Sequence, residues 1–456
     1  MNNRLLKAFI VIMLISLMGC DKAKPNRLFR SPVVGLIQNN QVPILIKATN
    51  VGNVRIGYQK ADKLLITLTD WNKLTDSNKF TTNLILRNLQ PNSDYRYRVE
   101  FENGNYSEWF MFKTFPAAEK SGKFSFVFSA CMREKYLGFN IFEKIEQLSP
   151  TFVALLGDQM YGDYDGNLNM LEQYLSDDSL RKKMIEEGET ILSDKTVLQA
   201  FRNKYSRVFD ENFQKMASRI PLMAIWDDHD YGLDDGGGDY ILKKDSQKLF
   251  LDFWKVKEED PRRKQEGIYF SESKNLKDKK ILILGLDTRY FRSPLVGEKR
   301  NYIATTDTST TILGEEQWEW LESEFQTETN LIILVSSIQI LATNHGFEKW
   351  SNFPHEKERL LSLIKESKKP VILVSGDRHK GAIYKQDNLY ELTTSSLNKP
   401  LPGWLETVWK ETDPLILGTM HYDMNYGVIR IESSGVISVE LKGKEGEILQ
   451  KASLKI

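Results

Sequence analysis

The sequence is poor in cysteine, which limits the covalent cross-links that the protein can form. Only Cys20 and Cys131 occur in 456 residues, so at most one intramolecular disulfide is possible. The sequence also lacks a charge imbalance, since Lys plus Arg and Asp plus Glu both number 62. A chain without net charge has no overall field that would attract nucleic acid or an anionic membrane surface. Any recognition by charge must therefore be local.

The N-terminal residues have the features of an export signal. Arg4 and Lys7 precede an apolar stretch, residues 8–18, that is too short to span a bilayer comfortably. The letters LMGC that follow resemble a bacterial lipobox, which implies cleavage before Cys20 and lipidation of that new N-terminus. We therefore expect residues 1–20 to be a lipoprotein signal peptide and residues 21–31 to be a tether. The alternative is an uncleaved anchor.

Export has a consequence for the second cysteine. A lipidated Cys20 would leave Cys131 without a disulfide partner, as a free thiol outside the cytoplasm. Such a thiol is expected to be buried as a small apolar residue or coordinated to a metal. We expect a membrane-anchored lipoprotein of the periplasm or the cell surface, and no protein partner is inferred.

The composition, 41% hydrophobic and 27% charged, is that of an ordinary globular protein, and the length allows two or three domains. Short alternating runs predict an all-β sandwich over residues 32–116. The runs are QVPILIKATN, VRIGYQK, KLLITLTD, TTNLILRNL, YRYRVEFEN and EWFMFKTF. LQPNSDYRYRVEFENG followed by SEWFMFKTFP resembles a fibronectin type III or immunoglobulin-like module, with a hairpin turn at Asn103 and Gly104. No catalytic motif is visible in it.

The pattern changes after residue 122, and residues 123–456 are predicted to form an α/β domain. Its apolar runs are KFSFVFSAC, TFVALLGD, PLMAIWDD, KKILILGLD, NLIILVSS and PVILVSGDRH. They alternate with the helical stretches FNIFEKIEQL, TVLQAFRNKYSRVF and GEEQWEWLESEFQ. Runs that are apolar on both faces are typical of strands covered on both sides by other layers.

The ends of these runs carry the residues of a predicted metal site. The residues concerned are Cys131, Asp158, Asp227 or Asp228, Asp377 and His379. Ligands of open α/β sheets bind outside the carboxyl ends of the strands, so these side chains are expected to converge. The segment at residues 226–240, WDDHDYGLDDGGGDY, holds six aspartates whose mutual repulsion favours a bound cation. The alternatives are helix N-caps for single residues and a solvated acidic loop for the segment.

Four motifs resemble those of the alkaline phosphatase D (PhoD-like) metallophosphatases. They are SAC at 129–131, GDQMY at 157–161, WDDHD at 226–230 and SGDRH at 375–379. LDTRYFRSP at 286–294 and GEEQWEWLESEF at 314–325 are also similar to that family. The resemblance covers essentially the whole mature chain. It implies a four-layer α/β metallophosphatase sandwich preceded by the all-β domain, and a metal-dependent phosphoric ester hydrolase.

Ligand chemistry beside this resemblance predicts two metals. A thiolate and a phenolate suit Fe3+. The iron would take Cys131, Asp158, Tyr161 and His379. This set resembles the iron site of purple acid phosphatases, with Cys131 in the place of an aspartate. Asp158 would bridge to a second cation that Asp228 and Asp377 also bind. Oxygen ligands suit Ca2+ or Mg2+, and the family is associated with calcium. Ser336, Ser337 and Gln339 are further candidates near the second metal.

Asp158 and His229 are the predicted catalytic residues. A hydroxide that bridges two metals would attack phosphorus in line, and His229 would protonate the leaving group. The alternative for His229 is a hydrogen-bonded core histidine. Arg289 and Arg292 are candidates for binding phosphate oxygens, or else they form structural ion pairs. The remaining aspartates of the acidic segment are expected to orient the ligands. These are Asp230, Asp234, Asp235 and Asp239. The histidines without a motif are expected at the surface or behind the ligands.

The expected function is hydrolysis of phosphate monoesters or diesters. One alternative is a phospholipase-like or nuclease-like phosphodiesterase, because the same pair of metals cleaves diesters. Another is a surface binding protein whose metal site has degenerated. The intact set of Cys131, Asp158, Tyr161, His229 and His379 argues against degeneration.

Overall fold

The computed structural model describes residues 25–35, 40–77, 79–114, 123–132, 141–163, 194–205, 211–254, 256–276, 278–401 and 411–455. The predicted signal peptide and the first residues of the tether lie outside these ranges. Within them, no helix combines the length and the apolar character that crossing a bilayer requires.

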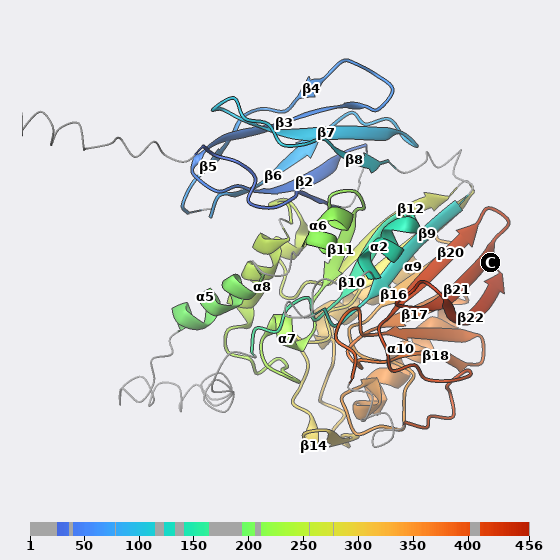
Figure 1. The fold of residues 1–456 in the computed structure, drawn as a ribbon. Helices are drawn as coiled ribbons and strands as arrows, with labels where there is room; N and C mark the ends of the chain where they lie inside the picture. The colour runs from blue at the N-terminus through green and yellow to red at the C-terminus, as the bar shows by residue number, and fades with distance from the viewer. Residues whose placement is uncertain are drawn as a thin grey trace, which may run out of the picture.

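The N-terminal strands form two antiparallel sheets that pack face to face (Figure 1). They are β1 (Val33–Val34), β2 (Val42–Lys47), β3 (Gly52–Lys60), β4 (Thr67–Leu68), β5 (Asn72–Leu74), β6 (Thr81–Leu86), β7 (Asp94–Phe101) and β8 (Phe110–Lys113). One sheet has the order β1-β2-β6, and the other has the order β4-β3-β7-β8, with β5 paired to β3. Alternate residues of β3 and β7, such as Val54 and Tyr97, fill the core between the sheets.

The run KLLITLTD differs from its prediction as a strand. Only Thr67 and Leu68 of this run are in a strand, whereas Leu64 and Leu65 lie in the irregular segment before β4 and are exposed. Gly104 has a φ of 83°, as the predicted Asn-Gly turn requires.

The remaining strands form two six-stranded mixed sheets that lie against each other. Sheet one, in the order β11-β10-β9-β20-β21-β22, contains β9 (Lys123–Ser129), β10 (Phe152–Leu156), β11 (Leu222–Ile225), β20 (Asn425–Glu432), β21 (Val436–Gly443) and β22 (Ile448–Lys455). Sheet two, in the order β12-β13-β16-β17-β19-β18, contains β12 (Phe270–Leu276), β13 (Lys279–Gly285), β16 (Leu331–Val335), β17 (Val371–Ser375), β18 (Gly381–Gln386) and β19 (Leu389–Thr394). A small hairpin pairs β14 (Val296–Glu298) with β15 (Asn301–Ile303).

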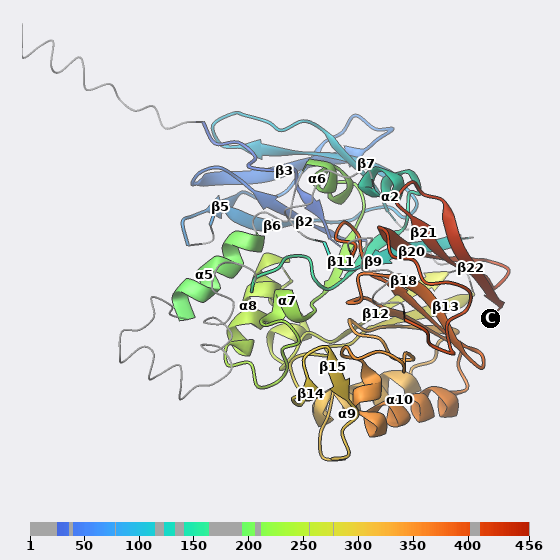
Figure 2. The ribbon, with the colours of Figure 1, turned by 60° about the horizontal axis from the view of Figure 1, so that its bottom comes forward.

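Helices cover the outer faces of both sheets (Figure 2). The described helices of this domain are α2 (Ile141–Gln147), α5 (Asp194–Tyr205), α6 (Glu211–Ala217), α7 (Asp228–Tyr231), α8 (Lys243–Phe253), α9 (Gly314–Gln326) and α10 (Pro354–Ser367), with short 3-10 helices at Pro261–Arg263 and Trp350–Asn352. Ile281 and Ile283 of β13 face sheet one, whereas Leu282 and Leu284 pack in a second core with the helices α9 and α10. The double-faced apolar runs therefore form the inner layers of a four-layer α/β sandwich, as predicted.

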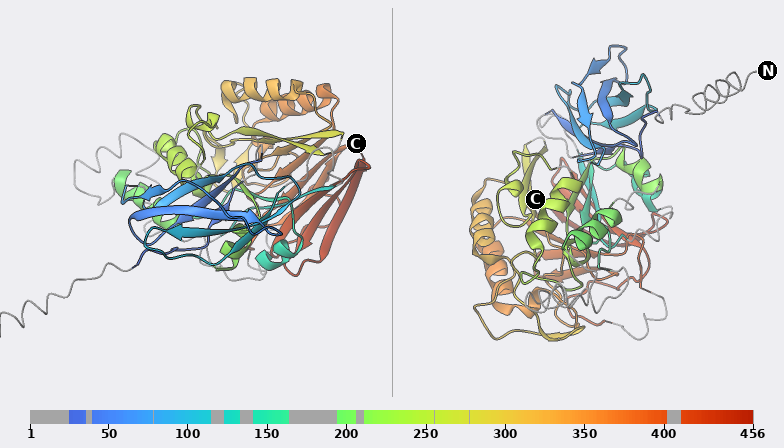
Figure 3. Two further views of the ribbon diagram at one scale, coloured as in Figure 1. Left: turned by 90° about the horizontal axis from the view of Figure 1, so that it is seen from above. Right: turned by 90° about the vertical axis from the view of Figure 1, so that its left-hand side faces the viewer.

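The β-sandwich packs against the α/β domain through its β1-β2-β6 sheet (Figure 3). Val33 and Leu45 belong to the same apolar core as sheet one, and Gly35 forms a β-bridge with Leu222 of β11. The β4-β3-β7-β8 sheet lies on the far side of the sandwich, away from the α/β domain.

Candidate active site

The two large sheets bring their strand ends together at one edge. β9, β10 and β11 are mutually parallel, as are β13, β16, β17 and β19. Beyond β9, the amide of Cys131 donates to the carbonyl of Gly157 at 3.3 Å, and Ala130 forms a bridge with Ser395 from the other sheet. The backbone thus joins segments that are far apart in sequence, which is the convergence that the strand ends predicted.

Most of the predicted ligands have an unusual backbone conformation. Positive φ angles occur at Cys131 (59°), Asp158 (56°), Asp377 (66°) and His379 (51°). The left-handed region costs a residue with a side chain on the order of 1 kcal/mol, so it persists only where surrounding structure imposes it. Gly157, before Asp158, has a φ of 106°, and a Cβ there would lie 2.3 Å from the Cβ of Asp227. The close approach of β10 and β11 therefore requires glycine.

Cys131, Asp158 and His379 form one group of possible metal ligands. A ligand atom from each lies within 4.8 Å of the others. The Cys131 Sγ is 3.4 Å from Oδ2 of Asp158, and the hydroxyl of Tyr161 donates to the same oxygen at 2.9 Å. The other oxygen of Asp158, Oδ1, is buried and has no hydrogen-bond donor among the residues that the structure describes. A buried carboxylate oxygen that accepts no hydrogen bond is suited to bind a cation.

Asp158 also belongs to a second group, with Asp228 and His229, whose ligand atoms again lie within 4.8 Å of one another. Backbone amides of His229 and Asp235 each donate to the carboxylate of Asp228 at 2.8 Å. Its neighbour Asp227 instead accepts from Nε of Arg289 at 2.7 Å. The geometry therefore favours Asp228 over Asp227 as a ligand.

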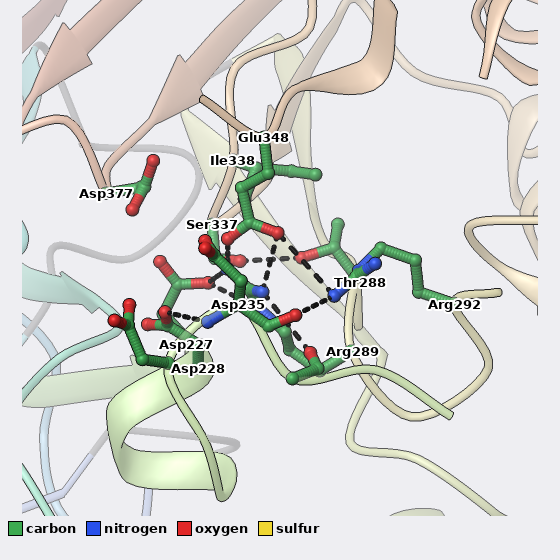
Figure 4. Close-up of polar contacts among 12 residues, drawn as sticks. Asp227, Asp228, Asp235, Thr288, Arg289, Arg292, Ser337, Ile338, Glu348 and Asp377 are labelled. Atoms are coloured by element: carbon green, nitrogen blue, oxygen red, sulfur yellow. Dashed lines mark hydrogen bonds and ion pairs between the residues drawn. The ribbon is translucent and has the colours of Figure 1, made fainter. Parts of the chain in front are cut away.

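Asp377 lies near these groups without joining them. It lines the same cavity as Asp158 and Asp228, but it belongs to none of the three-residue ligand groups within the described ranges. Figure 4 shows its carboxylate on the side of the cluster that carries Asp228.

His229 is held by a residue that the sequence prediction missed. Its Nδ1 is 2.8 and 2.9 Å from the two carboxylate oxygens of Asp163. Burial alone would lower the pKa of His229, but Asp163, with Asp228 and Asp158, raises it well above its ordinary value. His229 also lines the cavity, and its Nε2 is 3.9 Å from Oδ1 of Asp234. The signal was present in GDQMYGD, where Asp163 follows Tyr161 by two residues.

His379 is oriented for coordination through its other nitrogen. Its Nδ1 is 2.6 Å from the carbonyl oxygen of Lys399, so this nitrogen carries the proton and Nε2 keeps its lone pair. Burial lowers the pKa of His379 well below its ordinary value, and the cation of Lys399 lowers it further. A neutral imidazole with a free nitrogen is the form that binds metals. The sequence pattern gave no sign of Lys399.

Arg289 and Arg292 do not reach the cavity. Both side chains are fully buried, and neither lines the cavity at the ligand groups. Arg289 contacts Asp227 and Glu348, whereas Arg292 donates to the carbonyl of Asp235 (Figure 4). This position favours the structural ion pairs over phosphate binding. Truncating either partner of such a buried pair leaves an unpaired charge, which is strongly destabilising.

The other polar residues of the prediction support the site from behind. Asp230 accepts hydrogen bonds from the amides of Asp227, Asp158 and Gln159, which fixes the ends of β10 and β11. The candidates after β16 form hydrogen bonds with residues other than the predicted ligands. Ser336 bonds the carbonyl of Ile338, Ser337 bonds Thr288, and Gln339 bonds Thr393 and His345. His355 bonds the carbonyl of Thr310, and His421 is partly exposed.

The two ligand groups open into a cavity of about 260 Å³. Carboxylates and imidazoles line its inner part. Its other walls carry Arg300, Arg378, Lys380 and Lys399, together with Phe347. Arg378 and Lys380 share the carboxylate of Glu411, so these two cations are fixed in place. A small cavity with ligands at one end and cations around it suits an anionic substrate.

Comparison with known proteins decides the family. A sequence model of the family described as PhoD-like phosphatase matches residues 126–235 and 238–440, well over half of the chain. The chain belongs to the PhoD-like phosphatase family. It is therefore a metal-dependent phosphoric ester hydrolase. No curated protein matches the sequence significantly.

Solved structures show the same fold. The structure of PhoD superposes with a TM-score of 0.70 at 17% identity, over 93% of this chain and 88% of that chain. Purple acid phosphatase PPD1 from yellow lupin (Lupinus luteus) seeds superposes with a TM-score of 0.61 at 14% identity, over 93% of this chain and 74% of that one. These matches confirm the predicted metallophosphatase sandwich.

The chemistry of the donor set fits bound cations. Burial raises the pKa of Cys131, Asp158 and Tyr161 well above their ordinary values. The charge of Asp158 raises the pKa of Cys131 and Tyr161 further, and the charges of Asp228, Asp227 and Asp230 do the same for Asp158, although His229 lowers it. Three acidic groups that resist ionisation together become good ligands once a cation compensates their charge. The residues of this PhoD-like phosphatase therefore fit the metals that its family implies.

Metal-free protein is expected to lose stability as the pH rises from about 5 to about 8. Burial raises the pKa of Asp227 to about 7 and that of Asp230 to about 8. The aspartates of the unfolded chain have a pKa of about 3.9, so the folded state binds more protons in this pH range. The free energy of unfolding therefore falls as the pH rises. A bound cation favours the ionised carboxylates and should weaken or reverse the fall. Melting temperatures with chelator and with metal test this; a chelated protein that is more stable at the higher pH would contradict it.

Proposed function

We propose that this phosphatase is an exported, lipid-anchored enzyme that hydrolyses small phosphate esters with ferric iron and a second, oxygen-bound cation. The observation that carries the proposal is the position of Asp158, whose carboxylate belongs to both ligand groups. A carboxylate shared in this way is suited to hold two cations side by side.

The iron site would take the softer and more basic donors. These are Cys131, Asp158, Tyr161 and His379. The thiol and the phenol are both buried, and Tyr161 donates to the oxygen of Asp158 that also lies close to Cys131. Thiolate and phenolate favour an oxidised iron over calcium or magnesium. The hydrogen bond from His379 Nδ1 to the Lys399 carbonyl would keep Nε2 available for this metal.

The second cation would take oxygen ligands from Asp158, Asp228 and Asp377, which suits Ca2+ or Mg2+. Asp228 supports this role because burial alone would raise its pKa, yet His229, Arg289 and the amide of Asp235 keep it ionised. Asp230 would hold the β10 and β11 ends in register through its backbone hydrogen bonds.

When bound, two such cations supply Lewis acidity, which lowers the pKa of a water nucleophile and neutralises charge on the phosphoryl oxygens. His229 would donate a proton to the leaving oxygen from Nε2 while Asp163 holds Nδ1. Asp163 keeps the ring oriented and stabilises its protonated form. The fixed cations Arg378 and Lys380 would attract the ester and orient it.

The size of the cavity bears on the substrate. About 260 Å³ accommodates a phosphoryl group and a small leaving group, which favours small esters over a whole phospholipid. Nitrophenyl phosphate and bis(nitrophenyl) phosphate, compared at matched metal content, would separate monoesterase from diesterase activity. Hydrolysis of neither ester with any metal would contradict the proposed function.

The purified protein is expected to be coloured. If Tyr161 binds ferric iron as a phenolate, charge transfer from ligand to metal absorbs visible light, and a Cys131 thiolate adds a second transition; zinc gives neither. Tyr161→Phe should shift or abolish the visible band while keeping the ring that packs 4.3 Å from His229. Cys131→Ser should weaken iron binding more.

Tyr231→Phe is the matched control for the colour, because Tyr231 is equally buried and donates to the carbonyl of Gly237. Its spectrum should equal that of the wild type. Iron-loaded protein without a visible band, or an unchanged spectrum in Tyr161→Phe, would show that Tyr161 is not a ligand.

The location remains part of the proposal. Residues 1–20 would direct export, and lipid on Cys20 would hold the enzyme at a membrane facing the periplasm or the cell exterior. Mass spectrometry of the mature N-terminus from a lipoprotein-processing host would detect the acyl chains. A free or formylated Met1 would contradict the anchor.

A further inference from the structure

The outer face of the β4-β3-β7-β8 sheet carries a row of arginines. Alternation along β3 and β7 directs Val54, Ile56 and Val99 into the sandwich core. The intervening residues point outward, and among them Arg55 and Arg98 both pair with Glu100 at 2.9 Å. This face lies away from the α/β domain (Figure 1).

Aromatic side chains pack on these arginines. The guanidinium of Arg55 lies 4.4 Å from the ring centre of Trp71, and that of Arg98 lies 4.2 Å from Tyr106. Arg96 and Arg98 both approach Trp109, at 4.9 and 5.0 Å. Such cation–π contacts hold both the rings and the positive charges at the surface.

Aliphatic side chains extend the same surface. Leu64 is 90% exposed and Leu65 is 82% exposed, in the irregular segment before β4. Leu68 and Met111, at 46% and 50%, lie on the two outer strands of the sheet. Isolated exposed leucines are ordinary, but several exposed apolar side chains along one small sheet, from Leu64 beyond one end of β3 to Trp71 near its other end, mark an interaction surface.

The length of chain between Cys20 and the first described residue limits how far the sandwich can lie from a lipid on Cys20. Asn26 is tied to the β7–β8 loop, since Asn103 and Asn105 both donate to its carbonyl at 3.2 Å. Cys20 lies five residues before Pro25, a span of at most about 18 Å when extended. A lipid on Cys20 would therefore keep the sandwich, rather than the catalytic cavity, next to the bilayer.

We infer that the outer face of the β4-β3-β7-β8 sheet is a second membrane contact, which docks on an anionic phospholipid surface. Leu64 and Leu65 enter the boundary between head groups and acyl chains. Trp71 and Tyr106 lie at head-group depth, and the arginines face lipid phosphates. A single acyl anchor binds weakly and gains from a second contact of this kind.

The contacts on this face favour a lipid surface over a polysaccharide. Sugar rings stack on free aromatic faces, whereas here arginines already pack against Trp71, Trp109 and Tyr106. The exposed leucines add an apolar surface. Acyl chains can bury such a surface, whereas a polar sugar chain cannot.

Vesicle binding of the chain from Asp21 onward, made without leader or lipid, tests this inference independently of the anchor. The protein should sediment with vesicles of phosphatidylglycerol and phosphatidylcholine, less with phosphatidylcholine alone, and less at high salt. Leu64→Glu combined with Leu65→Glu should lower the affinity roughly tenfold or more, because two inserted side chains become charged. Arg96→Gln should reduce the preference for the anionic vesicles.

The matched control replaces two exposed apolar residues elsewhere, Val436→Glu with Ile448→Glu, which are 41% and 52% exposed on the α/β domain. It should bind vesicles as the wild type does. Unchanged melting temperature and nitrophenyl phosphate turnover would establish that the variants are folded. The inference is overturned if the wild-type protein does not bind anionic vesicles, or if the Leu64/Leu65 variant binds them as well as the wild type. Binding to insoluble glycan without binding to vesicles would also overturn it. Loss of turnover alone would count against the proposed hydrolysis and not against this surface.

Discussion

Asp158→Asn is expected to lower kcat by about 10³-fold or more, the largest effect of any single substitution in the site. The carboxylate of Asp158 contacts Cys131 and Tyr161 on one side and lies within 4.8 Å of the Asp228 ligand atom on the other. Asparagine keeps the shape but loses the charge, and it cannot compensate two cations at once. Both metals should therefore be bound more weakly.

This effect is measured as the turnover of a nitrophenyl ester at saturating metal concentration. The metal content of each protein is determined alongside. Asp239→Asn is the matched control, because Asp239 belongs to the same acidic segment but is exposed and lines no ligand group. It should keep nearly the full rate. A rate above about a tenth of the wild type for Asp158→Asn would rule out the shared-ligand role.

His229→Ala is expected to reduce kcat by roughly 10²–10⁴ for esters with poor leaving groups. The reason is that an alkoxide leaving group needs a proton, whereas nitrophenolate does not, so the loss should be smaller with a nitrophenyl ester. Asp163→Asn should have a weaker effect of the same kind, because it removes the charge that holds Nδ1 but leaves the imidazole in place.

The alkaline limb of the rate profile, where His229 loses its proton, separates this role from a structural one. Asp163 raises the pKa of His229, so Asp163→Asn should move the loss of the protonated form to lower pH. His421→Ala, which alters a partly exposed histidine outside the cavity, should leave both the rate and the profile unchanged. Equal losses for His229→Ala on both classes of ester would contradict proton donation.

Much of the fold was predictable because the apolar runs are long and lie between turn residues. Every run of the α/β domain became a strand, and alternate residues such as Ile283 and Leu284 face the two adjoining layers. KLLITLTD was the exception. Leu64 and Leu65 are not covered by any other layer of the described residues, so they lie in an irregular segment before β4 despite their apolar character.

The convergence of the candidate site was predictable for a different reason. Parallel strands end at one edge of a sheet, so residues such as Cys131 and Asp377 are brought close whatever their separation in sequence. The partners of these residues were not predictable. Lys399 and Glu348 contact His379 and Arg289 across long stretches of chain, so sequence spacing does not indicate them, and Asp163 was missed although it lies two residues after Tyr161.

The contacts of the two arginines were likewise not predictable from the sequence. The motif LDTRYFRSP shows that Arg289 and Arg292 carry charge, but it does not show which way their side chains point. The structure directs them to Glu348 and to the acidic segment, behind the ligands. In the same way, Asp227 is distinguished from the adjacent Asp228 by its bond from Arg289 and by the place of Asp228 in a ligand group, neither of which the sequence shows.

Anomalous diffraction at the iron absorption edge, from crystals of protein purified without added metal, tests the central proposal most directly. We expect a peak within bonding distance of Cys131 Sγ, the Tyr161 oxygen and Nε2 of His379, and a second, non-iron ion that shares Asp158. A single ion held without Cys131, or an iron peak away from Asp158, would contradict the two-metal account.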